Sequence, residues 1–470
     1  MSARSAGRRR FLKAGALAAG GGMAALRAGE LLARAAPNAD GLPASRLTVA
    51  WRNWSGLQQC AAQALAAPAD EAAIAALLRE STGTIRCVGS GHSFSPLVPT
   101  DGTLLALDRL SGLVSADKAA LTATVRGGTR INMLSRQLDA AGLGLRNLPD
   151  IDMQTLAGAI STGTHGTGAG LPALHADVVA MRIVTPQGET VACDERRHSD
   201  IFAAARVSLG SLGVITELTL RVVPAYNLYR QVRLRPLEEL LPLVPELARA
   251  HRNFEFYYLP FTGYAAVITH DADDGKDVLM PASQDEDALR DLRRLRDWLG
   301  NMPQLRRWVA GKLIDRHQAE EAKNRSWRLL STARRTRFNE SECHVPRDAG
   351  IACVTEVIRA LERRNDVFFP VEFRFVKGDD AWLSPFYRRD SCSIAVHAAH
   401  DEPWDYLVSD IGRIFRKHDG RPHWGKLHDF SARELAALYP RWKDFQEVRR
   451  RMDPHGRLLN PHLRALFGAA

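Results

Sequence analysis

Apolar residues recur at helical and strand spacing along the first half of the chain, and this pattern predicts short strands separated by helices. Residues 68–80 and 131–140 each carry apolar side chains three and four positions apart, so both segments are expected to be helices with one buried face. Short apolar runs predict strands at 85–88, 103–107 and 121–125. A β-branched run follows Leu212 and ends at Pro224, because proline cannot donate to a strand ladder.

The second half of the chain has a different pattern of apolar, aromatic and charged residues. Residues 254–259 form an aromatic run and residues 370–375 alternate between apolar and charged side chains, and both patterns are typical of strands. Between them, residues 285–300 place leucines and Trp298 on one helical face and arginines on the others, which predicts an amphipathic helix. A chain of 470 residues exceeds one typical domain, so the change near residue 226 predicts a boundary between two domains.

Residues 1–35 have the three parts of an export signal. The twin-arginine pattern Arg8-Arg9-Arg10-Phe11-Leu12-Lys13 precedes a weakly apolar run over residues 14–26, and Ala33-Arg34-Ala35 supplies an A-x-A cleavage site. This interpretation predicts export by the twin-arginine translocase to the periplasm, or a membrane anchor if the signal stays uncleaved. A basic, disordered arm is the alternative interpretation.

The net charge of +10 does not indicate a nucleic-acid partner. Residues 1–35 contain seven basic residues and one acidic residue, which supply +6 of that charge and leave +4 for the rest of the chain. The basic run over residues 325–337 has glutamates on both sides, so a solvated face is a better interpretation than a nucleic-acid or membrane patch. The hydrophobic content of 45% and the charged content of 25% are ordinary for a globular protein.

Six scattered cysteines provide no metal or redox motif. None of them forms a C-x-x-C pair, so neither a zinc site nor a thioredoxin-like site is indicated. An oxidising compartment permits disulfides, but the sequence does not pair the cysteines. His397 and His400 would point to opposite faces of a strand. The sequence therefore predicts no metal site.

A glycine-rich turn at residues 89–93 follows the strand predicted at 85–88. Gly89 and Gly91 flank a serine, and His92 follows at once. Glycines let main-chain N–H groups approach a ligand closely, and successive N–H groups form an anion-binding nest suited to a pyrophosphate. An imidazole fixed beside that nest could reach a ring system attached to the phosphates. Taken alone, the motif is as consistent with an ordinary Gly-Ser-Gly turn that carries a surface histidine as it is with a ligand-binding turn.

Two further glycine-containing segments follow. Residues 156–168 hold four glycines with hydroxyl side chains between them, which makes a loop able to wrap a polar ligand at close range. A flexible linker is the alternative, although linkers seldom follow an apolar helix pattern so directly. The third segment, residues 209–216, leads into the β-branched strand. No G-x-G-x-x-G lies between a predicted strand and helix, so a Rossmann dinucleotide site is not indicated.

Together, Gly89-Ser90-Gly91-His92-Ser93, the loop from Gly158 to Gly168 and Leu212-Gly213-Val214-Ile215-Thr216 resemble the flavin-binding domain of vanillyl-alcohol-oxidase-type flavoproteins. Trp54-Ser55-Gly56 is similar to the sugar-1,4-lactone oxidase and alditol oxidase branch, and the resemblance extends from about Trp51 to the C-terminus. It implies an α+β fold. A two-subdomain PCMH-type FAD-binding domain is expected over residues 45–225, followed by an α+β substrate-binding (cap) domain with a large antiparallel sheet over residues 226–470.

The resemblance implies FAD as the cofactor, attached covalently through an imidazole nitrogen of His92 to the flavin 8α-methyl group. A covalent bond prevents loss of the cofactor after export and raises the flavin reduction potential. The residues that the resemblance assigns to FAD binding are Val88, Gly89, Ser90, Gly91, His92, Ser93, Asp150, Thr155, Gly158, Ala159, Ile160, Ser161, Gly163, His165, Gly166, Ile215 and Lys426.

Two short segments of the second domain are expected to carry the reaction. Glu372 and Arg374 lie two residues apart on one face of a predicted strand, where charge is costly unless it is paired or ligated. A structural salt bridge is the alternative interpretation. Pro422-His423-Trp424-Gly425-Lys426 is a hallmark of the lactone and alditol oxidase branch, and Val371-Glu372-Phe373-Arg374 resembles its Glu-x-Arg. Residues 453–460 resemble its C-terminal pattern.

The same resemblance implies a role for four side chains. Lys426 is expected close to flavin and substrate, where a cation favours negative charge on the reduced ring and on a developing alkoxide. Arg374 is expected to polarise the reacting oxygen, and Glu372 to hold vicinal hydroxyls. His397 aligns with an active-site histidine and is expected to be the general base. A buried histidine whose ring nitrogens are hydrogen-bonded, without a catalytic role, is equally consistent with the sequence.

The sequence departs from the alditol oxidases beside the expected substrate and flavin. Ala399 replaces a substrate-contacting threonine, and Pro149-Asp150 replaces an Ala-Ser pair. We therefore expect a small polyol or sugar lactone as substrate, without a choice of sugar. The leading hypothesis is an oxidase that passes electrons to O2. A periplasmic dehydrogenase that reduces a quinone or a cytochrome is the nearest alternative, and a non-catalytic exported flavin-binding protein is a third.

Overall fold

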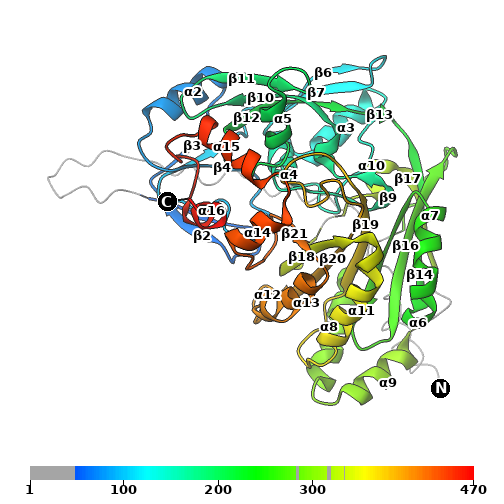
Figure 1. The fold of residues 1–470 in the computed structure, drawn as a ribbon. Coiled ribbons are helices and arrows are strands. Elements are labelled where there is room, and N and C mark those ends of the chain that lie inside the picture. The colour runs from blue at the N-terminus through cyan, green and yellow to red at the C-terminus, as the bar shows by residue number, and fades with distance from the viewer. Residues whose placement is uncertain (1–47, 282–284, 315–318, 333, 470) are drawn as a thin grey trace, which may run out of the picture.

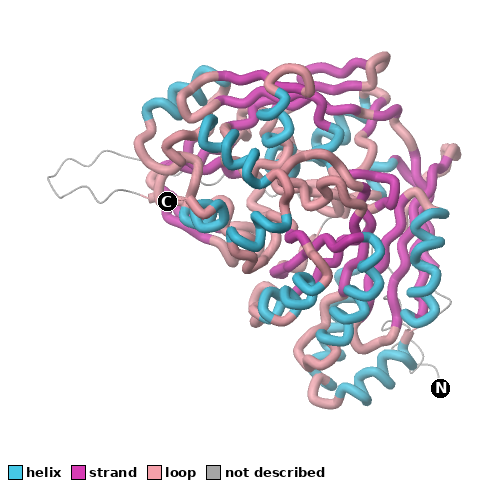
Figure 2. Tube along the Cα trace, viewed as in Figure 1, coloured by secondary structure: helices cyan, strands magenta, loops and turns pink. Residues whose placement is uncertain are grey.

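The computed structural model describes residues 48–469 except residues 282–284, 315–318 and 333. The export signal predicted at residues 1–35 lies outside the described residues. The first half of the described chain forms two main sheets, and the second half forms one sheet that is larger than either, as Figures 1 and 2 show. Among the helices of this described part, none has both the length and the apolar character needed to cross a membrane.

The strand before the glycine-rich turn belongs to a small parallel sheet with the order β3-β5-β4. Its elements, with the helix that packs on it, are β3 (Ala64–Ala66), α2 (Glu71–Glu80), β4 (Ile85–Val88) and β5 (Thr103–Ala106). The Asp70 side chain caps α2 by accepting the Ala73 N–H at 2.8 Å. The apolar face of α2 joins the core beneath this sheet, so the helix and strand expected here are confirmed.

The second main sheet is antiparallel and has the order β11-β10-β12-β7-β6. Its strands are β6 (Leu113–Asp117), β7 (Thr122–Arg126), β10 (Val178–Val184), β11 (Thr190–Asp194) and β12 (Val214–Arg221). The helices of this region are α3 (Ile131–Ala140), α4 (Leu156–Ser161) and α5 (Ser199–Ala205). Leu134 and Leu138 of α3 are fully buried, as their helical spacing predicts. This sheet and the parallel one are the two main sheets that precede the large sheet in the chain.

The large sheet of the second half is antiparallel along its main path, β17-β14-β16-β15-β19-β20-β18-β21. Its strands are β14 (Asn227–Pro236), β15 (Asn253–Leu259), β16 (Tyr264–Asp273), β17 (Ala319–Arg325), β18 (Phe338–Pro346), β19 (Val371–Lys377), β20 (Ser391–Ala399) and β21 (Arg421–Pro422). Strand β9 (Gly168–Pro172), which follows the second glycine loop, pairs in parallel with β19. That pairing brings the loop beside the strand that carries Glu372 and Arg374.

Helices flank the large sheet, among them α7 (Val244–Ala250), α8 (Asp285–Leu299), α9 (Pro303–Leu313), α11 (Gly350–Leu361) and α13 (Ile411–Lys417) (Figure 1). In α8, Leu292 and Leu295 are buried, which confirms the predicted apolar face. Trp298 was expected on the same face, and that expectation is wrong, because its side chain is 71% exposed. It lies at the edge of the apolar stripe, one residue before the helix ends at Leu299, where the side chain is open to solvent.

The C-terminal helices return to the first half of the chain. They are α14 (Ala432–Leu438), α15 (Trp442–Met452) and α16 (Pro461–Phe467), and Figure 1 shows them in red beside the blue N-terminal elements. The Asn460 amide donates to the carbonyls of Pro96 and Pro99, both at 2.9 Å, and the Arg457 carbonyl accepts the Ile85 N–H at 2.9 Å. The last residues of the chain therefore stabilise the region around the glycine-rich turn.

Candidate active site

Residues from both halves of the chain enclose a cavity of about 500 Å³, a size typical of small-molecule and cofactor sites. Its walls come from the turn after β4, from the residues around α4, from strands β18, β19 and β20, and from the Pro-His-Trp-Gly-Lys segment after β21. All four predicted catalytic residues line this cavity, together with all but three of the predicted cofactor residues. The structure thus brings together side chains separated by more than 300 positions in the sequence.

The turn that carries His92 is held by close contacts that only glycine allows. A Cβ atom on Gly89 would lie 2.3 Å from the hydroxyl oxygen of Thr155, and Gly91 has a φ of +67°. The Trp54 N–H donates to the Gly91 carbonyl at 2.8 Å, and the Trp54 and His92 rings lie 5.5 Å apart. The imidazole is therefore fixed against a rigid turn.

His92 is a neutral imidazole in this environment. Burial, together with the nearby cations Lys426 and Arg130, lowers the pKa of His92 to about 4. A neutral imidazole keeps a nitrogen lone pair at physiological pH, which is the form that can act as a nucleophile.

The second glycine loop differs from the prediction at three positions. Gly158, Ala159 and Ser161 of α4 line the cavity, but Ile160 points the other way and belongs to the main apolar core. Gly163 packs against Pro385, and Gly166 lies against the Leu148 carbonyl, where a Cβ would come within 2.2 Å. Neither glycine lines the cavity, so both shape the loop through its packing. Helical periodicity explains the position of Ile160, since α4 has one face toward the cavity and one toward the core.

Several lining residues were missed by the sequence interpretation. Gly127 and Gly128 follow β7, and a Cβ on either would meet a main-chain oxygen, at 2.2 Å from Ile215 O and 2.0 Å from Leu107 O respectively. The sequence feature that could have identified these two residues is a Gly-Gly pair just after a predicted strand. Gly213, at a φ of +154°, also lines the cavity.

Arg374 lies at the centre of a buried charged cluster. Its guanidinium forms an ion pair with Glu255 of the neighbouring strand β15, contacts the carboxyl group of Glu372 and donates to the Tyr257 hydroxyl at 2.9 Å. The β15–β19 register places Glu255 opposite Arg374 and Tyr257 opposite Glu372. Burial raises the pKa of Glu372 to about 8 even though Arg374 favours its ionised form. The raised pKa favours the protonated form of Glu372, which can donate a hydrogen bond to a hydroxyl oxygen.

Asp150 is a charged group beside this cluster. Although burial opposes its ionisation, Arg334 and Arg374 lower the pKa of Asp150 to about 2. Arg334 donates to its carboxylate at 2.7 Å, and the Thr332 hydroxyl donates to it at 2.7 Å. The negative charge that the sequence places here is thus balanced by residues of the second domain.

His397 and Lys426 meet at Glu340. The β18–β20 register places Glu340 opposite His397, and the imidazole Nε2 lies 3.7 Å from its Oε1. Nδ1 of His397 lies 3.2 Å from the Pro370 carbonyl oxygen and donates to it, which leaves the Nε2 lone pair available as a base. Burial lowers the pKa of His397 and so favours this neutral form.

Lys426 forms an ion pair with Glu340 and lies 3.8 Å from Glu342. Burial opposes its charge, but the two carboxylates outweigh this effect and raise the pKa of Lys426. The preceding Gly425 carbonyl accepts the Phe94 N–H at 2.7 Å. That hydrogen bond joins the Lys426 segment directly to the turn that carries His92, so a fixed cation stands beside the imidazole.

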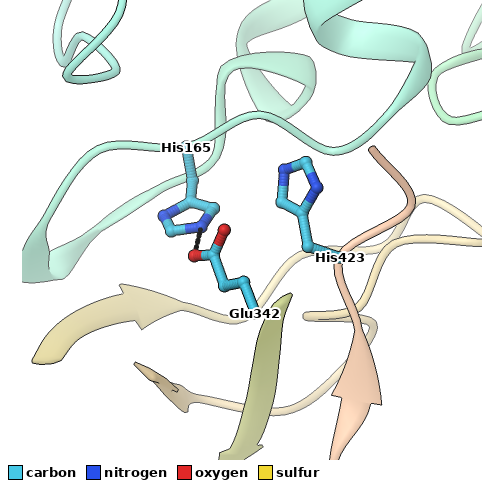
Figure 3. Close-up of side chains that lie close together, drawn as sticks. All are labelled: His165, Glu342 and His423. Carbon is cyan, nitrogen blue, oxygen red and sulfur yellow. Dashed lines mark hydrogen bonds and ion pairs between the residues drawn. The ribbon is translucent and has the colours of Figure 1, made fainter. Parts of the chain in front are cut away.

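Figure 3 shows a third buried group on the cavity wall: His165, Glu342 and His423. One ligand atom from each lies within 4.8 Å of the others, a spacing that a metal ion could use. However, the Gly425 N–H donates to Nδ1 of His423 at 3.0 Å, and Nε2 of His165 already faces Glu342 at 2.9 Å. Lys426 adds a positive charge beside the carboxylate. The three side chains are therefore better described as a buried polar cluster than as a metal site.

These features fit a flavin dinucleotide. The glycine turn and α4 line the cavity with glycines and other small residues, which leaves room for a pyrophosphate and a flat ring to approach the main chain. The neutral His92 lies at one part of the cavity wall, and Glu372, Arg374, His397 and Lys426 lie on the parts contributed by the second domain. The arrangement can hold a redox ring against a hydroxylated substrate.

Two family profiles match the chain. The profile described as D-arabinono-1,4-lactone oxidase matches residues 218–466, and the profile described as FAD binding domain matches residues 62–194. The first spans more than half of the chain, and the second contains the His92 turn and the second glycine loop.

Similar curated proteins span almost the whole chain. L-gulono-1,4-lactone dehydrogenase of Mycobacterium tuberculosis is 34% identical, with 89% of this chain and 99% of that protein covered. L-gulonolactone oxidase of Mus musculus is 30% identical, with coverage of 89% and 98%. Alditol oxidase of a Streptomyces species is also 30% identical, with coverage of 90% and 100%.

Among solved structures, a solvent-stable cholesterol oxidase superposes with a TM-score of 0.72 over 89% of this chain and 97% of its own. The sequence identity is 16%, so this similarity concerns the fold alone. It confirms the expected α+β fold with a PCMH-type FAD-binding domain and a large antiparallel sheet.

Proposed function

The chain belongs to the D-arabinono-1,4-lactone oxidase family and is an FAD-dependent oxidoreductase of CH–OH donors, and from that premise we propose that its substrate is a sugar lactone, an alditol or a related small polyol. One observation carries the proposal: the His92 turn and the side chains of Glu372, Arg374, His397 and Lys426 line a single cavity. A hydroxylated substrate bound there would meet an acid, a base and two cations within one site.

FAD is proposed to lie along the glycine turn and α4, with His92 joined covalently to the flavin 8α-methyl group. The neutral, buried imidazole and its fixed position against Trp54 support this attachment. Acid precipitation of the purified protein tests it. A yellow pellet and a yellow peptide containing His92 after proteolysis are expected, and a colourless pellet would refute the covalent bond while leaving FAD binding intact.

The bound flavin supplies a hydride acceptor at N5, and the protein side chains prepare the substrate. Arg374 is proposed to polarise the reacting oxygen, and protonated Glu372 to hold a neighbouring hydroxyl group. Nε2 of His397 is proposed to take the hydroxyl proton, since its Nδ1 proton is engaged with Pro370. Lys426 is proposed to stabilise the negative charge that develops beside it.

The experiment that tests the activity is anaerobic mixing of the holoenzyme with a panel of polyols and sugar 1,4-lactones. Loss of the oxidised flavin absorbance with at least one of them is expected. If none of them bleaches the flavin, the assignment as an oxidoreductase of these donors fails and a flavin-binding protein without turnover is favoured.

O2 is proposed as the electron acceptor, with a quinone or a cytochrome as the alternative. The relatives include proteins named as oxidases and as dehydrogenases, so both acceptor classes are represented among similar chains. Turnover with and without an artificial dye separates them. Stoichiometric peroxide supports the oxidase, whereas negligible peroxide with rapid dye reduction supports the dehydrogenase.

Export by the twin-arginine translocase is proposed from residues 1–35. The argument is the order of the Arg8-Arg9-Arg10 motif, the apolar run and Ala33-Arg34-Ala35. Fractionation of cells that express the full chain or an Arg8→Lys/Arg9→Lys/Arg10→Lys variant tests it. Periplasmic or membrane-attached protein is expected only for the unmodified chain.

A further inference from the structure

Five titratable side chains form a continuous row along the cavity wall, in the order His397, Glu340, Lys426, Glu342 and His165. Nε2 of His397 lies 3.7 Å from Glu340, which forms an ion pair with Lys426. Lys426 Nζ lies 3.8 Å from Glu342, and Glu342 Oε1 lies 2.9 Å from Nε2 of His165. Basic and acidic groups therefore alternate along the row, and its net charge depends on the protonation of the two terminal histidines.

The hydrogen bonds of His165 determine how many protons it shares with Glu342. Nδ1 lies 2.8 Å from the Gly166 carbonyl oxygen, which can only accept, so Nδ1 carries a proton. Nε2 faces Glu342 Oε1, so a second proton must lie between these two atoms, because otherwise two acceptors would face each other at 2.9 Å. The Ser393 hydroxyl donates to the same carboxylate oxygen and cannot serve this purpose.

The surroundings place the second proton on His165 rather than on the carboxylate. Although burial opposes ionisation of Glu342, the Ser393 hydroxyl donates to its carboxylate and Lys426 Nζ lies 3.8 Å away, and the pKa of Glu342 is held well below its usual range. The other histidine that faces the carboxylate remains neutral, because burial lowers the pKa of His423 to about 3. Burial likewise lowers the pKa of His344, whose ring lies 5.0 Å from that of His165.

We propose that His165 is an imidazolium that balances Glu342, so that the charges around Lys426 sum to zero rather than to one negative charge. Without the second proton, Glu340, Lys426 and Glu342 would sum to one negative charge. With it, the row is neutral when His397 is neutral. His165 and Glu342 are thus positioning residues for Lys426. The protonation of His165 does not depend on the proposed function. Only its effect on turnover rests on that function.

A second buried histidine–carboxylate pair provides a matched control. His175 Nε2 lies 2.8 Å from Asp379, and both side chains are as inaccessible as those of His165 and Glu342. Among the described residues, Nδ1 of His175 has no hydrogen-bond partner, so that ring does not face acceptors at both nitrogens. Neither His175 nor Asp379 lines the flavin cavity.

Nuclear magnetic resonance of the holoenzyme with ¹⁵N-labelled histidine measures the protonation directly. His165 is expected to show one-bond N–H correlations for both ring nitrogens at pH 7, assigned by their loss in His165→Gln. Slow exchange of both protons is expected from the burial of the ring. A single N–H correlation from His165 would overturn the proposal, whatever the substrate of the enzyme proves to be.

The midpoint potential of the bound flavin measures the charge of the cavity. His165→Gln leaves Glu342 unbalanced, and about a tenfold shift of the flavin toward its oxidised form is expected, which equals about 30 mV for a two-electron couple. Glu342→Gln and the double variant remove both charges of the pair, so their potentials are expected near that of the parent. The His175→Gln control is expected to leave the potential unchanged.

The alternative protonation state predicts the opposite pattern. If a neutral His165 stood beside an ionised Glu342, His165→Gln would leave the potential unchanged, while Glu342→Gln and the double variant would raise it. That pattern would overturn the proposal. The double variant also guards against a folding artefact, since it must recover the potential that His165→Gln loses.

Discussion

The hydroxyl oxygen of Thr155 occupies the space beside the α-carbon of Gly89, at 2.3 Å from where a Cβ atom would stand. The two residues come from different subdomain segments, one from the turn after β4 and the other from the residue before α4. Both line the cavity, so their contact joins the two glycine loops that surround the proposed flavin site. The absence of a side chain at position 89 is what lets the loops close on each other.

Gly89→Ala is therefore expected to separate the two loops. Such overpacking costs about 1–3 kcal/mol of stability, and the shifted turn should also bind flavin less completely. Thermal unfolding and the ratio of flavin to protein absorbance measure the two effects. Gly89 is not at a positive φ, so backbone strain does not add to the effect.

A second substitution separates steric overlap from other causes. Thr155→Ala removes the overlapping oxygen, and the remaining Cβ of residue 155 would lie 3.4 Å from the new methyl group. The double variant Gly89→Ala/Thr155→Ala is expected to recover most of the lost stability relative to Thr155→Ala alone. If it is no more stable than Gly89→Ala, the contact described here is not the cause.

Lys426→Met removes the cation between two carboxylates. The rate of anaerobic flavin reduction by the best substrate is expected to fall about 100- to 1,000-fold, the usual effect of removing a group that stabilises developing charge. Lys426→Arg keeps the charge and should lose much less. Stopped-flow absorbance measures both rates, and equal losses in the two variants would show that the charge of Lys426 is unimportant.

The general base proposed at His397 predicts an acid limit to the reaction. Since burial lowers the pKa of His397, the imidazole is neutral above its ordinary pKa of about 6.5 and gains a proton only at lower pH. The reduction rate is therefore expected to be constant near pH 7 and to fall only at a pH below the ordinary imidazole pKa of about 6.5. His397→Gln should lower the rate and abolish this acid limb. An unchanged limb in the variant would assign the titration to another group.

Local patterns were sufficient to predict the elements around the flavin site. The strand at 85–88, the glycine turn and the helix at 131–140 each follow from spacing within a few residues, and the structure contains all three. The Glu372–Arg374 pair was also predictable, because alternation along one strand places both side chains on one face.

Contacts between distant strands could not be predicted in the same way. Glu255 lies 119 positions from Arg374, and only the β15–β19 register makes them partners. Glu340 and Glu342 have the same spacing as Glu372 and Arg374, yet nothing in their own segment identifies Lys426 as their counter-ion. Helical spacing likewise placed Trp298 on the buried face, because the sequence does not show where the sheet beneath the helix ends.

Glu372 and Glu255 both contact Arg374, but the pH dependence of stability should distinguish them. Burial raises the pKa of Glu372 to about 8, above the ordinary value of 4.5 that applies to the unfolded chain. Between these pH values the folded state holds a proton that the unfolded state releases, so the contribution of Glu372 to stability decreases as the pH rises. Above pH 8 both states are ionised, and the contribution no longer changes.

Glu372→Gln removes this titration while it keeps a neutral side chain of similar shape. Relative to the parent, the variant is expected to gain stability progressively from about pH 4.5 to about pH 8, although its activity should fall. Glu255→Gln should instead destabilise the protein at neutral pH, because it removes the carboxylate that balances buried Arg374, at a cost of about 3 kcal/mol. Urea unfolding at a series of pH values measures both variants. If Glu372→Gln destabilises the protein by the same amount at every pH, Glu372 is ionised throughout, and its proposed role as a proton donor to a substrate hydroxyl fails.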